Sequence, residues 1–474
     1  MRKALIAVCL LFALAVGGIA AVHADVNEVR DQVVITDKVL YGDKAAAEGL
    51  TIRAEARLDK YLHWNTDYTI GAQPVTETEF VFAKEERWGD YEPGGLNTVS
   101  YHQWYGIDDQ DWENADSPEG LSGLALAYWE FFQTFEIGEE KDKLIRVGDY
   151  YDYYPFRFGL ELPNFYMDFY HVDGIAAGTE QGEIMRALTA KLEEYIRIPV
   201  LEEETIRISL YRSGEKQASR RGMGTGEGDF YHDVIYNALT ADACYFIINN
   251  RSRDGKLMDL SQVPGGYGIH ILPYTYSDDK PTTVDVEGIK MVYPLDEESE
   301  LLWFETTPDK SRLLLMTKET NGDCLLRVID CDGMKTIQET VLYTVTEERQ
   351  PYVERCQDNY ILIRTRDGSI ILLEERPDGT FERMLDIPVE EHQQVSDGFH
   401  TTYWDGEKLV LAIPWNVQHR DDGELCGFAV AVYDRTGPLF CGKYTSSLDT
   451  KSYDYYDPRN CTLWSDDPLH ISWK

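Results

Sequence analysis

The sequence predicts an all-β fold, a β-propeller of about seven four-stranded blades (range six to eight) with one inserted amphipathic helix. Three observations favour this class. Short apolar runs alternate with Asp-Gly or Asn-Gly turns, the pattern recurs along the second half of the chain, and a further apolar run precedes each recurrence. Four strands repeated about every 40 to 50 residues are typical of propeller blades.

The pattern is clearest at 359–387, where the runs YILIRT, SIILLEE and FERMLDI are separated by two turns. Each turn contains Asp-Gly, and glycine adopts the positive φ that tight hairpin turns need. The same order of runs and turns occurs at 312–343 and again at 408–446. The last copy is longer because it holds a polar insertion at 416–424. Three antiparallel strands are therefore predicted in each copy.

A fourth strand is predicted ahead of each copy, at 301–307, 352–356 and 399–404. No WD dipeptide or Gly-His signature accompanies these units, so the prediction concerns an architecture and not a named repeat family. A series of β-hairpins in a sandwich is the alternative.

The first residues predict export. Arg2 and Lys3 precede an uncharged apolar run from Ala4 to Val22, and small residues stand before Asp25. Residues 1–24 are therefore expected to be a signal peptide or an N-terminal membrane anchor, followed by a linker at 25–33. In both cases the protein is extracytoplasmic, either secreted or anchored to the outer face of the cell membrane.

A single propeller domain is expected at 34–474. Irregular blades occupy 34–213, regular repeats occupy 228–448, and a closing strand at 461–474 pairs with the first blade. Closure of this kind removes an exposed sheet edge.

The irregular part contains both strands and the inserted helix. The pattern predicts three strands at 49–71 and 78–88. It predicts one long hairpin at 123–155, and a helix is the alternative for the first arm of this hairpin. The helix is expected at 183–195. Its apolar face consists of Ile184, Met185, Leu188, Leu192 and Tyr195.

The formal net charge is -39 at pH 7 and apolar residues make up 43% of the chain, which suffices for a large core. A negative field repels phosphate backbones, so nucleic acid is not an expected partner, whereas cations and basic ligands are attracted. Solubility is the alternative reason for this charge.

The cysteines that follow the export segment are odd in number and irregularly spaced, and none forms a C-x-x-C pair. This pattern predicts mostly free, buried thiols and no zinc site.

Five segments resemble uncharacterised exported, β-propeller-like proteins of Gram-positive bacteria. They are YLHWNTDYTIG, DYYDYYP, YIRIPVL, VPGGYGI and MVYPLD, and they are spread over most of the chain. The resemblance implies an exported propeller and carries no known activity.

Acidic side chains gather at 108–120, and a hard cation such as Ca²⁺ prefers oxygen ligands. The candidate metal ligands are Asp108, Asp109, Asp111, Glu113 and Asp116. The spacing departs from the helix-loop-helix calcium motif, because Asn114 and Gly120 stand where that motif has Gly and Glu. A solvated acidic surface is the alternative, and no other cofactor is expected.

A run of tyrosines with nearby tryptophans is the candidate binding site, since aromatic rings stack on sugars and peptides. Its members are Tyr150, Tyr151, Tyr153, Tyr154, Trp104 and Trp112. Packing of these rings inside the blades is the alternative.

The predicted function is a non-enzymatic binding or scaffold protein that presents acidic, aromatic-rich loops to a peptide, sugar or cation. The alternative is a secreted propeller hydrolase of the glycosidase kind, which uses two carboxylates as acid and base. Its candidates are Asp149, Asp152, Asp168 and Asp173, whose aromatic neighbours could raise a pKa by desolvation.

Overall fold

The computed structural model describes residues 2–59, 62–82, 99–103, 112, 115–162, 165–167, 180–215, 217–225, 235–252, 255–277, 280–346, 349–357, 359–389, 401–415, 425–449 and 469–473. This part of the chain is mostly β-structure, which confirms the predicted class in its coarse form. The chain divides into two compact units. Unit 1 comprises Met1–Tyr91 and Glu347–Lys474, and unit 2 comprises Glu92–Thr346.

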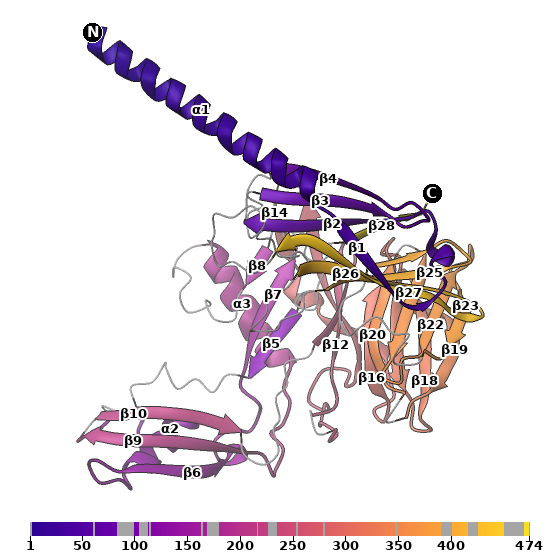
Figure 1. The fold of residues 1–474 in the computed structure, drawn as a ribbon. Coiled ribbons are helices and arrows are strands. Elements are labelled where there is room, and N and C mark those ends of the chain that lie inside the picture. The colour runs from indigo at the N-terminus through magenta and orange to yellow at the C-terminus, as the bar shows by residue number, and fades with distance from the viewer. Residues whose placement is uncertain are drawn as a thin grey trace. The chain divides into compact units, whose positions relative to one another are not determined.

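The described residues of unit 1 form three antiparallel sheets, ordered β28-β2-β3-β4, β1-β27-β26-β25-β24 and β20-β21-β22-β23 (Figure 1). The strands are β1 (Ile35–Gly42), β2 (Leu50–Asp59), β3 (Leu62–Thr69), β4 (Val75–Phe82), β20 (Pro351–Gln357), β21 (Tyr360–Thr365), β22 (Ile370–Glu375), β23 (Phe381–Ile387), β24 (Thr401–Trp404), β25 (Leu409–Trp415), β26 (Leu425–Asp434), β27 (Gly437–Asp449) and β28 (Leu469–Trp473). A short 3-10 helix, η1 (Lys44–Ala47), follows β1.

The predicted repeat pattern is confirmed in unit 1. The runs at 352–356 and 399–404 supply β20 and β24, the first strands of their sheets. Gly379 lies between β22 and β23 with φ 80°, and Gly437 begins β27 with φ 123°. Glycine therefore stands at both turns where the backbone needs a positive φ.

Strands from both ends of the described chain enter the sheets of unit 1. β28 pairs antiparallel with β2 and lies within 461–474, where a closing strand was predicted. Closure of a ring by this strand stays a prediction. β1 pairs antiparallel with β27.

The cores of unit 1 lie between sheets that follow one another. Tyr68, Phe428 and Tyr444 pack their rings together between the sheet of β2 and the sheet of β26, and Leu469 of β28 joins them with 0% exposure. A second core, which includes Leu372 and Leu411, joins the sheet of β22 to the sheet of β25. Each sheet is thus held by apolar contacts on its faces as well as by hydrogen bonds.

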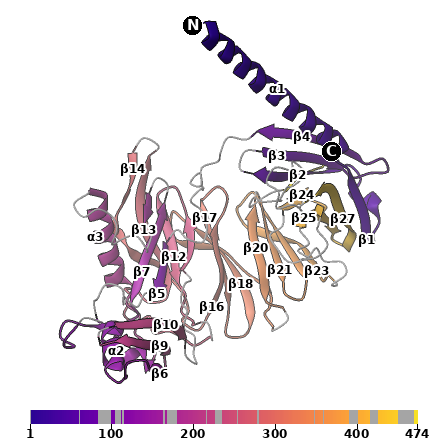
Figure 2. The same cartoon turned by 60° about the vertical axis from the view of Figure 1, so that its left-hand side comes forward.

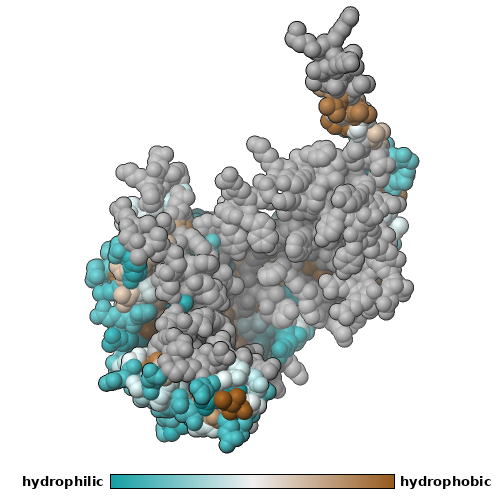
Figure 3. Space-filling model, turned by 90° about the vertical axis from the view of Figure 1, so that its left-hand side faces the viewer, coloured by the Kyte–Doolittle hydropathy of each residue, from teal (hydrophilic) through white to brown (hydrophobic). Residues whose placement is uncertain are grey.

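Helix α1 (Arg2–Gln32) precedes the sheets and extends away from them (Figure 1). Leu11, Phe12, Leu14 and Ile19 are 67%, 72%, 72% and 70% exposed, and Figure 3 shows this part of the helix as hydrophobic. Among the residues described, no helix is long and apolar enough to cross a membrane. Cleavage or retention of residues 1–24 stays a prediction.

The described residues of unit 2 form four sheets and two α-helices (Figure 2). Three sheets have the orders β5-β7-β8, β11-β12-β13-β14 with β15 on β13, and β16-β17-β18-β19; the fourth is β10-β9-β6. The strands are β5 (Val99–Gln103), β6 (Glu140–Arg146), β7 (Phe156–Leu162), β8 (Phe165–Met167), β9 (Thr205–Gly214), β10 (Gln217–Thr225), β11 (Ile235–Leu239), β12 (Ala243–Ile248), β13 (Gly268–Ser277), β14 (Lys280–Val284), β15 (Lys290–Pro294), β16 (Glu300–Thr306), β17 (Arg312–Lys318), β18 (Asp323–Asp330) and β19 (Lys335–Thr344).

Two separate cores hold unit 2. The first joins the sheets of β7, β12 and β17 and includes residues such as Phe158, Phe246 and Leu315. The second lies between α2 (Gly123–Phe132) and the sheet β10-β9-β6. The insertion that contains α2 therefore has its own apolar interior.

The prediction of one long hairpin at 123–155 is wrong. The first arm forms the helix α2, as the alternative prediction expected. β6 pairs with β9 and not with that arm. Leu124, Ala127, Tyr128 and Phe131 follow the helical spacing and are buried. A helix forms here because β6, β9 and β10 form a separate sheet, and the buried side chains of α2 cover the apolar face of that sheet.

The inserted helix is confirmed as α3, although it begins at Glu180 (Glu180–Tyr195). Met185, Leu188 and Leu192 are buried as predicted, whereas Ile184 is 45% exposed. α3 packs beside β7 (Figure 2). Two other short elements of unit 2 are the 3-10 helices η2 (Val147–Asp149) and η3 (Val286–Gly288).

His270 of β13 holds the end of α3. The Tyr195 hydroxyl lies 2.9 Å from its Nδ1, and Nε2 lies 3.2 Å from the carbonyl oxygen of Gly266. Donation from Nε2 to Gly266 leaves Nδ1 free to accept from Tyr195, which defines a neutral tautomer. Burial lowers the pKa of His270 to about 4, against a smaller opposing effect of the Gly266 carbonyl.

Five cysteines fall in the part of the chain with described side chains, and all are thiols. Cys244, Cys324 and Cys441 are buried, and Cys331 and Cys356 are intermediate. For these positions the predicted thiol state is confirmed.

Replacement of Leu469 by alanine tests the contribution of β28. Leu469 fills a core position at 0% exposure, so Leu469→Ala should lower the free energy of unfolding by about 2–4 kcal/mol in urea denaturation. His470→Ala, at the neighbouring exposed position of β28, should change it by less than about 0.5 kcal/mol. Equal effects of the two changes would show that β28 is not docked.

The pH dependence of stability tests the buried imidazole. Because the pKa of His270 is about 4 in the folded protein and about 6.5 when unfolded, only the unfolded state binds this proton between those values. Stability from this group is complete above about pH 6.5 and is lost as the pH falls towards 4. His270→Asn keeps an acceptor for Tyr195 and does not titrate.

At pH 7 the His270→Asn variant should have a lower free energy of unfolding than the natural protein. The difference between the two free energies should shrink by roughly 3 kcal/mol by pH 4. Urea denaturation of both proteins across this pH range measures this difference. A constant difference would contradict the neutral state assigned to His270.

Candidate functional site

The turn between β15 and β16 is acidic and is held by its own first residue. Asp296 accepts the backbone N–H of Glu298 at 3.0 Å through its carboxylate, and its carbonyl oxygen accepts from the Ser299 hydroxyl at 2.7 Å. Aspartate closes turns in this way because its side chain reaches the main chain two residues ahead. The side chains of Asp296, Glu297 and Glu298 remain exposed.

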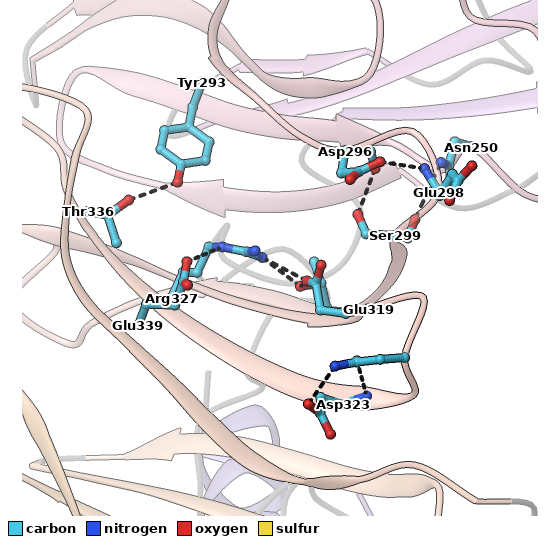
Figure 4. Close-up of polar contacts among 12 residues, drawn as sticks. Asn250, Tyr293, Asp296, Glu298, Ser299, Glu319, Asp323, Arg327, Thr336 and Glu339 are labelled. Atoms are coloured by element: carbon cyan, nitrogen blue, oxygen red, sulfur yellow. Dashed lines mark hydrogen bonds and ion pairs between the residues drawn. The ribbon is translucent and has the colours of Figure 1, made fainter.

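Two side chains that follow β12 attach this turn to the neighbouring sheet. Asn250 Nδ2 donates to the carbonyl oxygen of Glu297 at 2.7 Å, and Arg251 Nη2 donates to that of Glu298 at 2.7 Å. Figure 4 shows the Asn250 amide beside Glu298 and Ser299. These two side chains therefore hold the turn through its main chain and do not use the carboxylates of Glu297 and Glu298.

A second acidic turn is attached to the same segment. Glu203 forms an ion pair with Lys256 at 2.5 Å, and Glu202 lies 3.8 Å from Arg146. The Glu202 side chain is 91% exposed. Glu203 and residues 297–298 thus contact the same segment, 250–256, although they are far apart in the sequence.

These two turns define the acidic rim, which consists of Glu202, Glu203, Asp296, Glu297 and Glu298. Each member is exposed. Within the described residues, no ion pair to Asp296, Glu297 or Glu298 is formed. Uncompensated carboxylates in one place produce a negative potential that attracts cations.

A more enclosed cluster lies between β18 and its neighbours. Arg327 Nη1 donates to the Thr317 hydroxyl at 2.7 Å and contacts Glu319 at 3.2 Å, and Nε donates to Glu339 at 3.0 Å. The Arg327 side chain is 16% exposed, so these contacts are better shielded from solvent than those of the rim. Figure 4 shows Arg327 between its two carboxylate partners.

Two further contacts frame this cluster. The Tyr293 hydroxyl lies 2.8 Å from that of Thr336, which joins β15 to the beginning of β19. Asn321 donates to Asp323 at 2.8 Å in the turn before β18. Figure 4 shows the contact of Tyr293 with Thr336, which links the sheet of β15 to the sheet of β19.

The aromatic residues predicted as a binding site are divided between two cores. Trp112 is 5% exposed and packs with α2, and Tyr154 is 4% exposed in the other core of unit 2. Tyr150 and Tyr151 pack beside α2, where the Tyr150 hydroxyl donates to Glu130 at 2.8 Å. Tyr153 is 38% exposed. Trp104 lies outside the described residues, and ligand binding by this group stays a prediction.

The predicted metal ligands Asp108, Asp109, Asp111 and Glu113 also lie outside the described residues, and Asp116 is exposed. In the part of the chain that the structure describes, no three His, Cys, Asp or Glu side chains are arranged to hold a metal ion. Of the hydrolase candidates, Asp149 and Asp152 are exposed, and Asp168 and Asp173 are outside the described residues.

Sequence reasoning missed the acidic rim, although a signal was present. Residues 296–300 read Asp-Glu-Glu-Ser-Glu directly ahead of a predicted first strand. Acids at this density are common in the chain, so the run alone does not distinguish a site from a solvated turn. Its attachment to the segment that also contacts Glu203 depends on Asn250, Arg251 and Lys256, and no sequence pattern connects these residues.

Replacement of Arg327 by methionine tests the enclosed cluster. Methionine keeps the aliphatic volume and removes the guanidinium, which leaves the half-buried Glu319 without its cation. Arg327→Met should lower the free energy of unfolding by about 1–2 kcal/mol, less than for a fully buried pair because Glu339 is partly solvated.

Arg186→Met is the matched control, because the Arg186 and Glu183 side chains of this ion pair are 41% and 65% exposed. This change should lower the free energy of unfolding by less than about 0.5 kcal/mol. Urea denaturation gives both values. A cost for Arg327→Met no larger than that of the control would refute the enclosed role.

Comparisons with known proteins add little to this geometry. No protein-family model matches the sequence, and no curated protein matches it. The chain is similar to a Lactobacillus plantarum protein at 13% identity, with a TM-score of 0.24, over 52% of this chain and 65% of that one.

It is also similar to the periplasmic gluconolactonase of Pseudomonas aeruginosa at 9% identity, with a TM-score of 0.24, over 52% of this chain and 78% of that one. A putative 6-phosphogluconolactonase from Bacteroides fragilis gives 12% identity, a TM-score of 0.24, and coverage of 58% and 83%. At these TM-scores the similarities carry no argument about function.

Proposed function

We propose that this protein is a non-enzymatic binding module whose acidic rim holds a basic peptide. The observation that carries the proposal is that two exposed acidic turns, 202–203 and 296–298, are both attached to the segment 250–256, the first through Lys256 and the second through Asn250 and Arg251. These acids come from two turns. Among the described residues, Lys256 pairs with Glu203 and Arg146 lies near Glu202, whereas no cation pairs with Asp296, Glu297 or Glu298. The site is thus arranged without neutralising most of its charge.

Electrostatics favours a peptide with several positive charges over a single small cation. A ligand with several ammonium or guanidinium groups can meet carboxylates on both turns at once, and each exposed contact is weak alone. The net charge of -39 adds a long-range attraction that speeds association.

We further propose that the sheets are the blades of a β-propeller, six in number among the described residues, which is the lower end of the predicted range. In unit 1 the sheets of β2, β26 and β22 share cores in sequence, and in unit 2 the sheets of β7, β12 and β17 do so. The sheet β10-β9-β6 has its own core with α2 and is an insertion under this proposal.

An extracytoplasmic location remains part of the proposal, with the protein secreted or anchored. It rests on Arg2, Lys3 and the uncharged run at 4–22. A basic peptide outside the cell is then the natural ligand class.

Charge reversal in the rim tests the function. Hexalysine serves as the probe, and its dissociation constant is measured by isothermal titration calorimetry at low and at physiological ionic strength. Glu297→Lys with Glu298→Lys should weaken binding by about tenfold at low salt, because two attractive contacts become repulsive. Binding to the natural protein should weaken as salt rises.

Glu140→Lys with Asp142→Lys is the matched control, since these exposed acids of β6 give the same change in net charge far from the rim in sequence. The control should shift the dissociation constant by less than about threefold. Equal losses in the two double variants would mean that overall charge, and not the rim, attracts the probe.

A further inference from the structure

Strand β6 is an edge of the sheet β10-β9-β6, and its pairing is regular. Among the described strands it pairs with β9 alone, from Glu140 opposite Tyr211 to Arg146 opposite Thr205, without a register shift. The other edge strand, β10, shifts its register twice against β9. Figure 1 shows β6 at the outer margin of this sheet. Because bulges protect a sheet edge from further pairing, β6 is the edge of this sheet that can accept another strand.

One face of β6 belongs to the core with α2. Ile145 is buried there, and the ammonium groups of Lys141 and Lys143 lie 5.1 and 5.6 Å from the ring centres of Phe135 and Phe131. α2 packs on β9, one strand in from the edge. If a second copy of β6 paired here, the two copies of β9 would lie three strand spacings apart, about 14 Å, which exceeds the helix diameter of about 10–12 Å. Both copies of α2 therefore fit over one continuous sheet.

The other face of β6 is exposed. Successive residues of a strand point to opposite faces, so Asp142, Leu144 and Arg146 share this face. Leu144 is 53% exposed, although it is apolar. Asp142 is exposed and forms no ion pair with any described residue. The Arg146 side chain is 53% exposed, and its Nη2 donates to the carbonyl oxygen of Glu202 at 3.1 Å, whereas a guanidinium has further N–H donors.

This face is complementary to a second copy of itself. If two β6 strands pair antiparallel about a two-fold axis through Leu144, that side chain faces the partner's Leu144. Asp142 then faces the partner's Arg146, and symmetry repeats this opposite-charge pair on the other side of the axis. Residues opposite each other in such a ladder have Cβ atoms about 4.5–5.5 Å apart, close enough for both kinds of contact. An axis through Asp142 or Lys143 would instead place a like charge opposite itself.

We propose that two copies of this chain associate through β6 in this register, so that the sheet continues from one copy into the other. Main-chain hydrogen bonds, one apolar pair and two ion pairs form the contact. A strand of seven residues buries less surface than a stable dimer needs, and the net charge of -39 opposes association. The dissociation constant is therefore on the order of 100 µM. At low micromolar concentration the chain is a monomer, and its peptide binding is unaffected.

Sedimentation equilibrium of the full chain, without peptide, tests the proposal. Measurements cover about 10 to 300 µM protein at physiological ionic strength, where long-range repulsion is screened. The natural protein should show a monomer–dimer equilibrium. Asp142→Arg should raise the dimer dissociation constant at least about tenfold, because arginines then face each other at both ends of the contact. Adding Arg146→Asp to this variant should bring the constant back to within about threefold of the natural value, since opposite charges face each other again.

Glu140→Arg is the matched control. It makes the same change in net charge on the same face of β6, but in this register it lies opposite a position beyond the end of the partner strand. It should change the dissociation constant by less than about threefold. A natural protein that stays monomeric at every concentration would overturn the proposal. Equal losses for Asp142→Arg and Glu140→Arg, or a double variant that does not recover, would also overturn it. None of these outcomes concerns the acidic rim, because no peptide is present.

Discussion

The pairing of strands from opposite ends of the chain is the interaction on which unit 1 depends. Thr36 of β1 lies opposite Thr445 of β27, and Leu50 of β2 lies opposite Trp473 of β28. Closing such long loops costs conformational entropy, although that cost grows slowly with length. Hydrogen bonds along both ladders and burial of Leu469 offset it. Without these pairs, β2 and β27 would expose unpaired edges.

The sheets of unit 2 are held together in another way. Its sheets of β7, β12 and β17 share one core, and side chains supply links where strands do not pair. Asn237 joins β11 to Val99 through both amide atoms, and His270 joins β13 to Tyr195. Sheets held in this manner fix the short turns at their ends, so the acids of the rim are placed without the cost of ordering a long loop.

Charge has two roles in this protein, and burial separates them. Around Arg327 the acids are partly enclosed and paired, so they stabilise neighbouring strands within the sheet β16-β17-β18-β19. In the acidic rim they are exposed and mostly unpaired, so they raise the local field. The proposed binding of a basic peptide rests on the second arrangement, whereas composition alone predicted a preference for cations and basic ligands.

The sequence by itself determined the four-strand repeat, the turn glycines, α3 and the strand β28, because periods of 2 and 3.6 and the demands of tight turns are local properties. It could not decide between strand and helix at 123–132, since the partner of β6 lies more than fifty residues away in β9. It also missed the acidic rim. Only tertiary packing brings Glu203 to Lys256 and Glu298 to Arg251, and no local pattern encodes contacts between separate turns.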